Sequence, residues 1–254
     1  MTITQKQIFC IILCVGLALT FPGCANDSSS PTSETHYAQK GPGQPADDTT
    51  GSDISSPNHY PPGTIVIAAI GDSITYGRGS TVGGYPPMLE QKLRAAGYNV
   101  VVLNEGVPGE ISPETEERFL EVIANVDAAL LMIGINDIIN PRGDYSTIAL
   151  IERMLDQAII SKTVPVASTV TPASSESDYA WINPRVDGLN YEIEQAVAAR
   201  SPKAYLADNH AAILANGGDT LYADRIHFTD QGYNVIADEW FRVLTEQKIL
   251  DHLK

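Results

Sequence analysis

Five short apolar runs alternate with segments of helical periodicity between residues 65 and 244 of this chain. Each run is nearly continuous in apolar residues, which is typical of strands that are buried on both faces of a sheet. The runs predict strands over residues 65–70, 100–103, 128–133, 164–170 and 204–207.

Between these runs, apolar residues recur every three or four positions, as they do along one buried face of an α-helix. Four such faces consist of Tyr85, Leu89, Leu93 and Ala96; Ile148, Ile151, Leu155 and Ala158; Val186, Leu189, Ile193 and Val197; and Tyr233, Ile236, Trp240 and Val243. The pairs Ser112-Pro113 and Asn183-Pro184 predict helix N-caps, each followed by proline at the first helical position.

This alternation of strands and helices predicts the fold class. Strands joined by helical crossovers form a parallel sheet with helices on both faces. Residues 63–254 are therefore expected to form one α/β domain, a three-layer α/β/α sandwich around a five-stranded parallel sheet. The domain is long enough, and apolar enough, to bury a sizeable core.

The first 24 residues have the pattern of an export signal. Lys6 precedes an apolar run over residues 8–21, which is shorter than the roughly 20 residues that span a bilayer. Cys24 then follows Gly23, and a small residue before cysteine resembles a bacterial lipoprotein processing site. The two residues before Gly23 are not those preferred there, so a lipid anchor on Cys24 and plain secretion both stay open.

Residues 25–62 predict a disordered tether. The segment is rich in Ser, Thr, Pro, Gly and Asp, and Ile54 is its one branched aliphatic residue. Such a composition cannot bury enough apolar surface to offset chain entropy. As a flexible linker it would span about 35 Å. A disordered N-terminus without any tethering role stays open if Cys24 carries no lipid.

The cysteine content and the net charge limit the disulfides and the binding partners that the protein can have. Cys10 and Cys14 lie within the predicted signal, so processing leaves Cys24 alone and no intramolecular disulfide can form. The chain has 31 acidic and 16 basic residues, a formal net charge of −15. That charge disfavours binding to nucleic acid or to anionic membrane surfaces. We therefore expect membrane association only through a lipid on Cys24.

Four short polar segments carry the candidate chemistry. They are Gly71-Asp72-Ser73, Gly106-Val107-Pro108-Gly109, Gly134-Ile135-Asn136-Asp137 and Asp224-Arg225-Ile226-His227. The first three follow the first three predicted strands. Since ligands bind beyond the carboxyl ends of the strands in open α/β sheets, we expect these segments to converge on one edge.

Ser73, His227 and Asp224 are the residue types of a nucleophile, its base and the group that orients the base. An alcohol is a poor nucleophile near neutral pH, and an imidazole held in one tautomer by a carboxylate can activate it. Asp224 and His227 are three positions apart, which one helical or tight turn brings onto one face. The backbone N–H groups of Ser73 and Gly109 and the side-chain amide of Asn136 are candidate oxyanion donors.

Together the four segments resemble the SGNH, or GDSL, hydrolase family of esterases and lipases. The resemblance implies a flavodoxin-like fold in which Ser73 is the nucleophile, Gly109 and Asn136 complete the oxyanion hole, and Asp224 and His227 form the Asp-x-x-His pair. It spans most of the chain from Ile65 to Leu244, with every segment in the family's order. It implies neither a metal nor an organic cofactor.

One local feature departs from the family pattern, and a second argues against the α/β-hydrolase fold. Pro108 stands where the family often has a small polar residue, which removes one N–H donor but leaves that of Gly109. Thr75 lies two residues after Ser73, so the Gly-x-Ser-x-Gly pattern of the α/β-hydrolase fold is absent.

Simpler interpretations exist for the same residues. Ser73 alone would be a turn or cap serine, and Asp72 is expected to be a structural hydrogen-bonding residue. Asp224-x-x-His227 is also half of a metal site, although no His or Cys cluster accompanies it. His210, after the fifth predicted strand, is the competing base.

We expect an exported serine esterase that hydrolyses short-chain carboxylic esters through an acyl-enzyme. The short-chain preference rests on the absence of a segment long enough to form a lid, since the longest rim loop covers residues 171–182. Within it, Tyr179 and Trp181 are as consistent with packing or exposure as with substrate contact. The alternatives are a carbohydrate acetylesterase, a lysophospholipase or a thioesterase of the same family, and a tethered carbohydrate-binding module without turnover.

Overall fold

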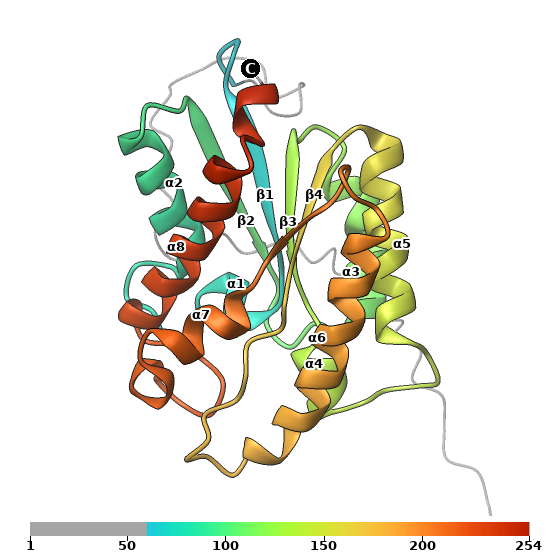
Figure 1. Cartoon of the computed structure of the whole chain (residues 1–254), viewed down its shortest axis with the longest axis vertical. Helices are drawn as coiled ribbons and strands as arrows, with labels where there is room; N and C mark the ends of the chain where they lie inside the picture. Colours follow the sequence, from blue (N-terminus) through green and yellow to red (C-terminus); the bar gives the residue numbers. More distant parts are fainter. Residues whose placement is uncertain (1–59, 254) are drawn as a thin grey trace, which may run out of the picture. The chain divides into compact units, whose positions relative to one another are not determined.

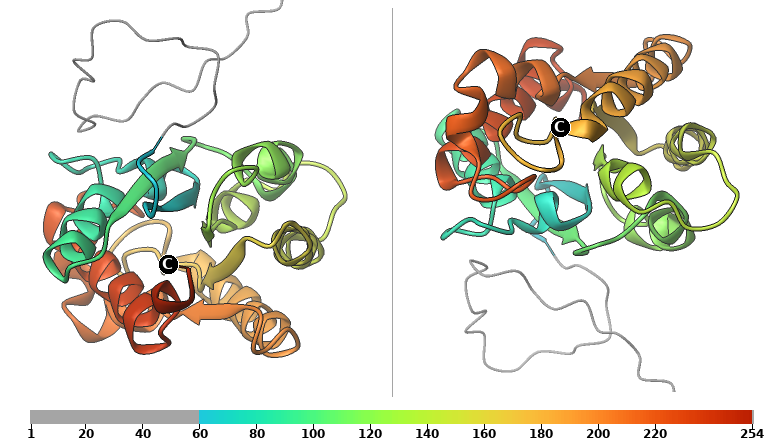
Figure 2. Two further views of the ribbon diagram at one scale, coloured as in Figure 1. Left: turned by 90° about the horizontal axis from the view of Figure 1, so that it is seen from above. Right: turned by 90° about the horizontal axis from the view of Figure 1, so that it is seen from below.

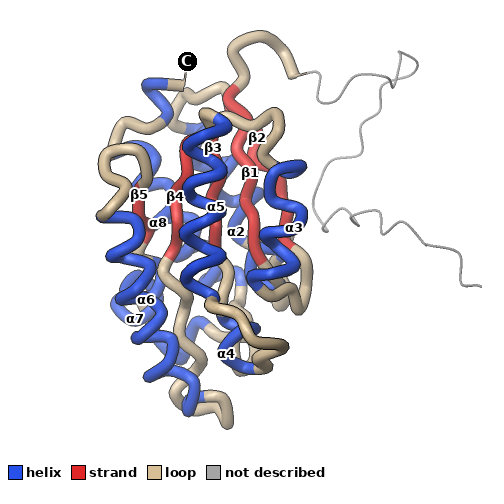
Figure 3. The backbone as a smooth tube through the Cα atoms, turned by 90° about the vertical axis from the view of Figure 1, so that its right-hand side faces the viewer, coloured by secondary structure: helices blue, strands red, loops and turns tan. Residues whose placement is uncertain are grey.

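The computed structural model describes residues 60–253, and these contain one parallel β-sheet. Its strands lie in the order β2-β1-β3-β4-β5, and every neighbouring pair is parallel (Figure 1 and Figure 3). The strands are β1 Ile65–Gly71, β2 Val100–Gly106, β3 Ala128–Met132, β4 Val164–Ser168 and β5 Tyr205–Ala207. The predicted five-stranded parallel α/β fold is therefore confirmed. The predicted signal, Cys24 and the tether as far as residue 59 lie outside the described residues.

Helices cover both faces of the sheet (Figure 2). On one face α2 packs against α8 and α8 against α7, and on the other α3 packs against α5 and α5 against α6. The helices are α1 Ser73–Tyr76, α2 Tyr85–Ala95, α3 Ser112–Val122, α4 Ile135–Ile139, α5 Thr147–Ser161, α6 Asn183–Ala198, α7 Asn209–Ala215 and α8 Asp230–Glu246, with short 3₁₀ turns η1 Ala180–Ile182, η2 Gly218–Leu221 and η3 Leu250–His252.

The core explains why the strands read as continuous apolar runs. All seven residues of β1 and all five of β3 are buried, because helices cover both sides of these central strands. Across the α2–α8 contact, the rings of Tyr85 and Trp240 stack with their centroids 6.1 Å apart, and neither residue is exposed. Burial of two aromatic side chains there stabilises the contact by several kcal/mol.

Two predicted helix caps are wrong by one residue. Ser112 and Asn183 are the first residues of α3 and α6, and the cap positions fall on the isoleucines before them. Both polar side chains bind elsewhere: the Ser112 hydroxyl donates to Asp137, and the Asn183 amide bonds the backbone of Ala173. Tertiary partners outcompete local capping here.

The short helices at the carboxyl ends of the strands could not be predicted from a repeat of apolar residues in the sequence. α1, α4 and α7 have four, five and seven residues, too few for an apolar repeat to be recognised. α1 and α4 lie at the lower end of the strands in Figure 1, where β1 and β3 end. None of the helices described for residues 60–253 is long and apolar enough to cross a membrane.

Candidate active site

Ser73 stands at a sharp strand-to-helix junction. β1 ends at Gly71, and Asp72 caps α1 by accepting a 2.9 Å hydrogen bond from the Ile74 N–H. The backbone is crowded here, because a Cβ on Gly71 would lie 2.2 Å from the carbonyl oxygen of Met132 on the neighbouring strand. Glycine thus allows β1 and β3 to close together beneath the serine.

Asp72 has the structural position expected from the sequence. Its side chain is almost wholly buried, and burial raises its pKa to about 7, against the opposing hydrogen bond from Ile74. The nearby carboxylates of Glu110 and Asp137 raise the pKa further. Because its carboxyl oxygen accepts from the Ile74 N–H at the start of α1, Asp72 holds the backbone on either side of Ser73.

The structure brings Ser73 and His227 together across the chain. Ser73 Oγ lies 2.7 Å from His227 Nε2, although 154 positions separate the two residues. On the far side of the ring, Nδ1 lies 2.8 Å and 3.0 Å from the two carboxylate oxygens of Asp224. An ionised carboxylate only accepts hydrogen bonds, so the ring proton sits on Nδ1 and Nε2 is free to accept from the serine.

A tight loop, not a helix, holds the Asp224–His227 pair. The Ala223 N–H donates to the carbonyl of His227 at 2.8 Å, and Asp224 Oδ1 accepts from the backbone N–H groups of Ile226 and His227 at 3.0 and 2.9 Å. Burial opposes ionisation of Asp224, but these donors and the imidazole outweigh it and lower its pKa. The carboxylate is thus a fixed acceptor for the ring.

His227 stays neutral more readily than a free imidazole. Burial lowers its pKa below the ordinary value, and the exposed guanidinium of Arg78 lowers it further, against the opposing effect of Asp224. Arg78 belongs to the turn that follows the serine: its N–H donates to the Ser73 carbonyl at 3.0 Å, and its carbonyl accepts from the buried Tyr233 hydroxyl at 2.7 Å. A neutral imidazole is the form that can accept a proton.

Three hydrogen-bond donors lie at the ends of the first three strands. The N–H of Ser73 begins α1, and within residues 60–253 neither it nor the N–H of Gly109 has a protein acceptor. Gly109 has φ of +82°, a left-handed conformation that glycine adopts without strain. The Asn136 amide nitrogen donates one hydrogen to the Glu110 carbonyl at 2.9 Å, which leaves its second hydrogen available.

Two buried carboxylates that the sequence had not singled out support these donors. Glu110 pairs with Arg118 at 2.6 Å and accepts from the Thr115 hydroxyl. Asp137, directly after Asn136, accepts from the N–H and hydroxyl of Ser112, so it ties α4 to α3. Both residues lie within the motifs or beside them, but their role depends on contacts that the sequence does not record.

The competing base lies elsewhere. His210 Nε2 is 3.3 Å from Asp187 on α6, and the backbone N–H of His210 donates to the hydroxyl of Thr169. Ser73 is hydrogen-bonded to His227 instead. In the described part of the chain, no cluster of three or more His, Cys, Asp or Glu side chains is arranged to hold a metal ion.

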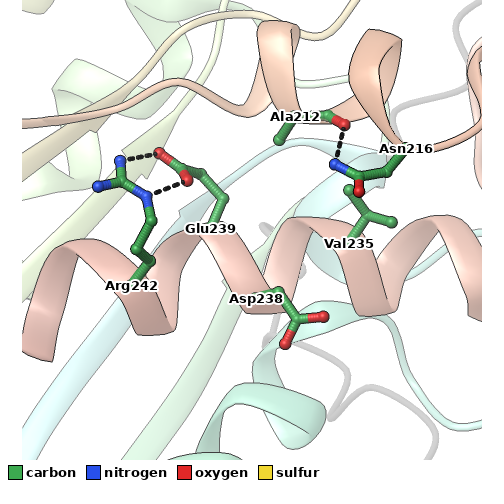
Figure 4. A pocket seen from close by; sticks show the side chains of 6 residues that line it. All are labelled: Ala212, Asn216, Val235, Asp238, Glu239 and Arg242. Carbon is green, nitrogen blue, oxygen red and sulfur yellow. Dashed lines mark hydrogen bonds and ion pairs between the residues drawn. The ribbon is translucent and has the colours of Figure 1, made fainter.

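Two surface hollows lie apart from Ser73. One, of about 220 Å³, lies between α7 and α8, and Figure 4 shows two hydrogen-bonded pairs among its lining residues. Arg242 binds Glu239 through two nitrogens, and the Asn216 amide donates to the Ala212 carbonyl. The second, of about 420 Å³, lies between α2 and the start of α8, where Asp230 binds Ser80 and Thr81. Neither is lined by Ser73 or His227.

The sequence profile of the GDSL-like lipase/acylhydrolase family matches residues 69–235, which include all four motifs and more than half of the chain. The chain belongs to this family. As a GDSL-family hydrolase it is a carboxylic ester hydrolase, so a binding module without catalysis is not its function. No curated protein matches the chain.

Solved structures of esterases share the fold of this GDSL-family hydrolase. A lipase/acylhydrolase from Enterococcus faecalis is 24% identical with a TM-score of 0.63, covering 75% of this chain and 97% of its own. An acetylxylan esterase from Geobacillus stearothermophilus is 19% identical with a TM-score of 0.62, covering 71% and 94%. A GDSL-like lipase from Bacteroides thetaiotaomicron is 18% identical with a TM-score of 0.56, covering 74% and 89%. At these identities the likeness establishes the fold alone.

Proposed function

We propose that this GDSL-family hydrolase is an exported serine esterase that removes short acyl groups through an acyl-enzyme. The observation that carries the proposal is the hydrogen-bonded chain from Ser73 Oγ through His227 to Asp224, at 2.7 and 2.8 Å. Nucleophile, base and orienting carboxylate already have the geometry that proton transfer requires.

In the acylation step, Ser73 Oγ attacks the ester carbonyl carbon while His227 Nε2 takes the hydroxyl proton. The carbonyl electron pair moves onto oxygen, where the N–H groups of Ser73 and Gly109 and the second amide hydrogen of Asn136 are placed to bind it. Asp224 stabilises the imidazolium. When the intermediate collapses, the C–O bond to the alcohol breaks and His227 gives the proton to the leaving oxygen.

Deacylation repeats these steps with water. His227 Nε2 takes a proton from a water molecule whose oxygen attacks the acyl carbon, and the resulting intermediate releases the carboxylic acid as the proton returns to Ser73 Oγ. Every proton transfer is thus served by the same nitrogen. The low pKa of His227 keeps this nitrogen unprotonated at neutral pH.

Small acyl groups are the expected substrates because the longest candidate rim loop, residues 171–182, is too short to fold into a lid over Ser73. A buried methylene contributes about 0.8 kcal/mol, but only where a wall exists to bury it. Within that loop, the segment from Thr171 to Ser174 is buried in the domain. Acetyl to butyryl esters are therefore the expected substrates. The Geobacillus neighbour, an acetylxylan esterase, suggests an acetylated glycan as one form of such a substrate.

Export is inferred from the sequence. The apolar run before Cys24 and the polar segment after it support a lipid-anchored enzyme of the bacterial cell envelope, with plain secretion as the alternative.

Two measurements test the proposed activity. A fluorophosphonate probe should label wild-type protein at Ser73 and fail to label Ser73→Ala, because only an activated serine reacts. The kcat/KM values for p-nitrophenyl esters should then fall from acetate and butyrate towards palmitate. A steady rise into the long chains would show an acyl groove, and the assignment would move to a lipase or lysophospholipase.

A further inference from the structure

Trp181 is an exposed aromatic residue in an otherwise well-packed part of the fold. It is 53% exposed, whereas the following residue, Ile182, is fully buried, and Tyr179 packs against the core. The other tryptophan, Trp240, is fully buried. Single exposed apolar side chains are common, so exposure alone assigns no role to Trp181.

The Trp181 ring is held in place by a neighbouring cation. The Arg185 guanidinium lies over the ring, 5.3 Å from its centroid, and Arg185 stands on the first turn of α6. Such contacts contribute about 0.5–1 kcal/mol at exposed sites. Arg185 covers one face of the ring, and Trp181 is still 53% exposed, so part of the residue remains accessible to a ligand. The Arg185 contact therefore favours one orientation of this accessible aromatic ring before a ligand binds.

The loop that carries Trp181 is fastened to the loop that carries the proposed base. The Ser174 N–H donates to the Arg225 carbonyl at 2.9 Å. Arg225 also pairs with Asp178 at 2.7 Å, and its guanidinium lies over the Tyr179 ring at 4.9 Å. Since Arg225 stands two residues before His227, the position of the rim loop is set relative to the catalytic loop.

Side-chain hydrogen bonds hold the first residues of the same loop. Asn183 bonds both the N–H and the carbonyl of Ala173, at 2.8 and 3.0 Å. Asp219 accepts from the Ser174 hydroxyl at 2.8 Å and from the Ser175 N–H at 2.7 Å. These contacts limit the freedom of the loop, so Trp181 does not gain its exposure from a loosely held segment.

The platform lies at the end of the sheet where the candidate site is built. The chain leaves β4 and turns into α6 at the lower end of the strands in Figure 1, the same end at which α1 begins with Ser73. Two residues of extended chain span at most about 7 Å. This limit applies to the separation of Tyr179 and Trp181, and likewise to that of Arg225 and His227. The contact of the Arg225 guanidinium with the Tyr179 ring therefore links the segment that carries Trp181 to the catalytic loop.

We propose that the exposed ring of Trp181 binds a neutral sugar ring of an acetylated oligosaccharide whose ester is cleaved at Ser73. This inference rests on the proposed esterase function and identifies the alcohol part of the ester substrate as a sugar. A pyranose ring has one face of C–H groups, which stacks on an aromatic ring, and a rim of hydroxyls that need polar partners. Arg185, which lies over the tryptophan ring, is exposed, as are Glu176 and Asp178 in the same loop. The acidic chain, at −15, disfavours anionic sugars.

Kinetics with two substrate classes tests this. We expect Trp181→Ala to raise KM for acetylated xylotetraose or acetylated cellotetraose about tenfold, a loss of about 1.4 kcal/mol of binding free energy, with little change in kcat. Hydrolysis of p-nitrophenyl acetate, which has no sugar, should be unchanged. Trp181→Phe should retain most of the effect because it keeps an aromatic face. Tyr191→Ala is the matched control, because Tyr191 is an exposed aromatic residue, at 65%, that lies on α6 about 12 Å beyond the first residue of that helix.

Intrinsic fluorescence gives an independent readout without turnover. Because Trp240 is buried, unacetylated xylotetraose or cellotetraose should change only the emission of Trp181, with saturation, and Trp181→Phe should show no response.

The outcomes separate this inference from the proposed function. If wild type cleaves p-nitrophenyl acetate but Trp181→Ala leaves KM for both acetylated tetrasaccharides unchanged, or if wild type neither binds nor cleaves them, the sugar platform is wrong and the esterase assignment stands. An equal loss on p-nitrophenyl acetate would show a structural role for Trp181 and would also reject the platform. Failure of wild type to cleave any ester would instead reject the proposed function.

Discussion

Replacement of Asn136 by alanine should separate a catalytic amide from a structural one. One amide hydrogen of Asn136 is used by the Glu110 carbonyl, at 2.9 Å, and the second is available for the oxyanion. Loss of one oxyanion donor costs about 2.7–4 kcal/mol of transition-state stabilisation, so kcat should fall about 10²–10³-fold with a smaller change in KM.

The same substitution should also lower stability slightly. The Glu110 carbonyl loses its donor, and the net value of such a hydrogen bond is about 1 kcal/mol. For a domain of this size, Tm should fall by about 2–4 °C. The activity loss is therefore far larger than the loss of folded protein can explain.

The assay combines initial rates on p-nitrophenyl acetate with thermal unfolding, and Asn190→Ala is the matched control. Asn190 is a buried asparagine whose amide bonds the N–H and carbonyl of Val170, at 2.7 and 2.9 Å, outside the site. Its loss should lower Tm by at least as much and leave kcat within a few fold. If Asn136→Ala behaves like Asn190→Ala, or changes KM alone, the oxyanion role of Asn136 is wrong.

Three further substitutions test the rest of the site and the export signal. Ser73→Ala should reduce esterase activity by several orders of magnitude with little change in Tm, and near wild-type rates from the purified variant would exclude Ser73 as the nucleophile. Arg78→Ala removes a positive charge that lowers the pKa of His227, so that pKa should rise and the acid limb of the kcat/KM profile should move to higher pH. Arg78→Lys keeps the charge and should leave the acid limb in place. An unmoved acid limb in Arg78→Ala would refute the electrostatic argument. Cys24→Ser should move the protein from the membrane fraction to the soluble fraction or leave it unprocessed, and an unmodified mature N-terminus in wild type, by mass spectrometry, would reject the lipid anchor.

The secondary structure was predictable where the physics is local. A strand buried on both faces must be apolar at every position, and a helix against a sheet must repeat its apolar residues every three or four positions. Both constraints act on neighbouring residues, so β1 to β5 and the long helices could be read from the sequence. α1 and α4 could not, because four or five residues are too few to show a repeat.

The candidate residues were also recognisable, because each stands in a short motif. What the sequence could not supply is how these motifs meet. The 2.7 Å contact between Ser73 and His227 depends on α8, the sheet order and the turn after the serine, all of which act over long separations in the chain. For the same reason the sequence placed Ser112 and Asn183 as caps, while the folded chain uses their side chains in contacts with Asp137 and Ala173.

The sequence by itself therefore determined the strands and long helices, the fold class and the chemical groups of this protein, because apolar patterns and short motifs involve residues that are close together in the chain. Only the tertiary structure decided which groups touch, which proton position His227 can hold, and that Trp181 is an exposed ring beneath the Arg185 guanidinium. Hydrogen bonds and ring contacts act over a few ångströms, and only folding brings residues far apart in the chain within that range.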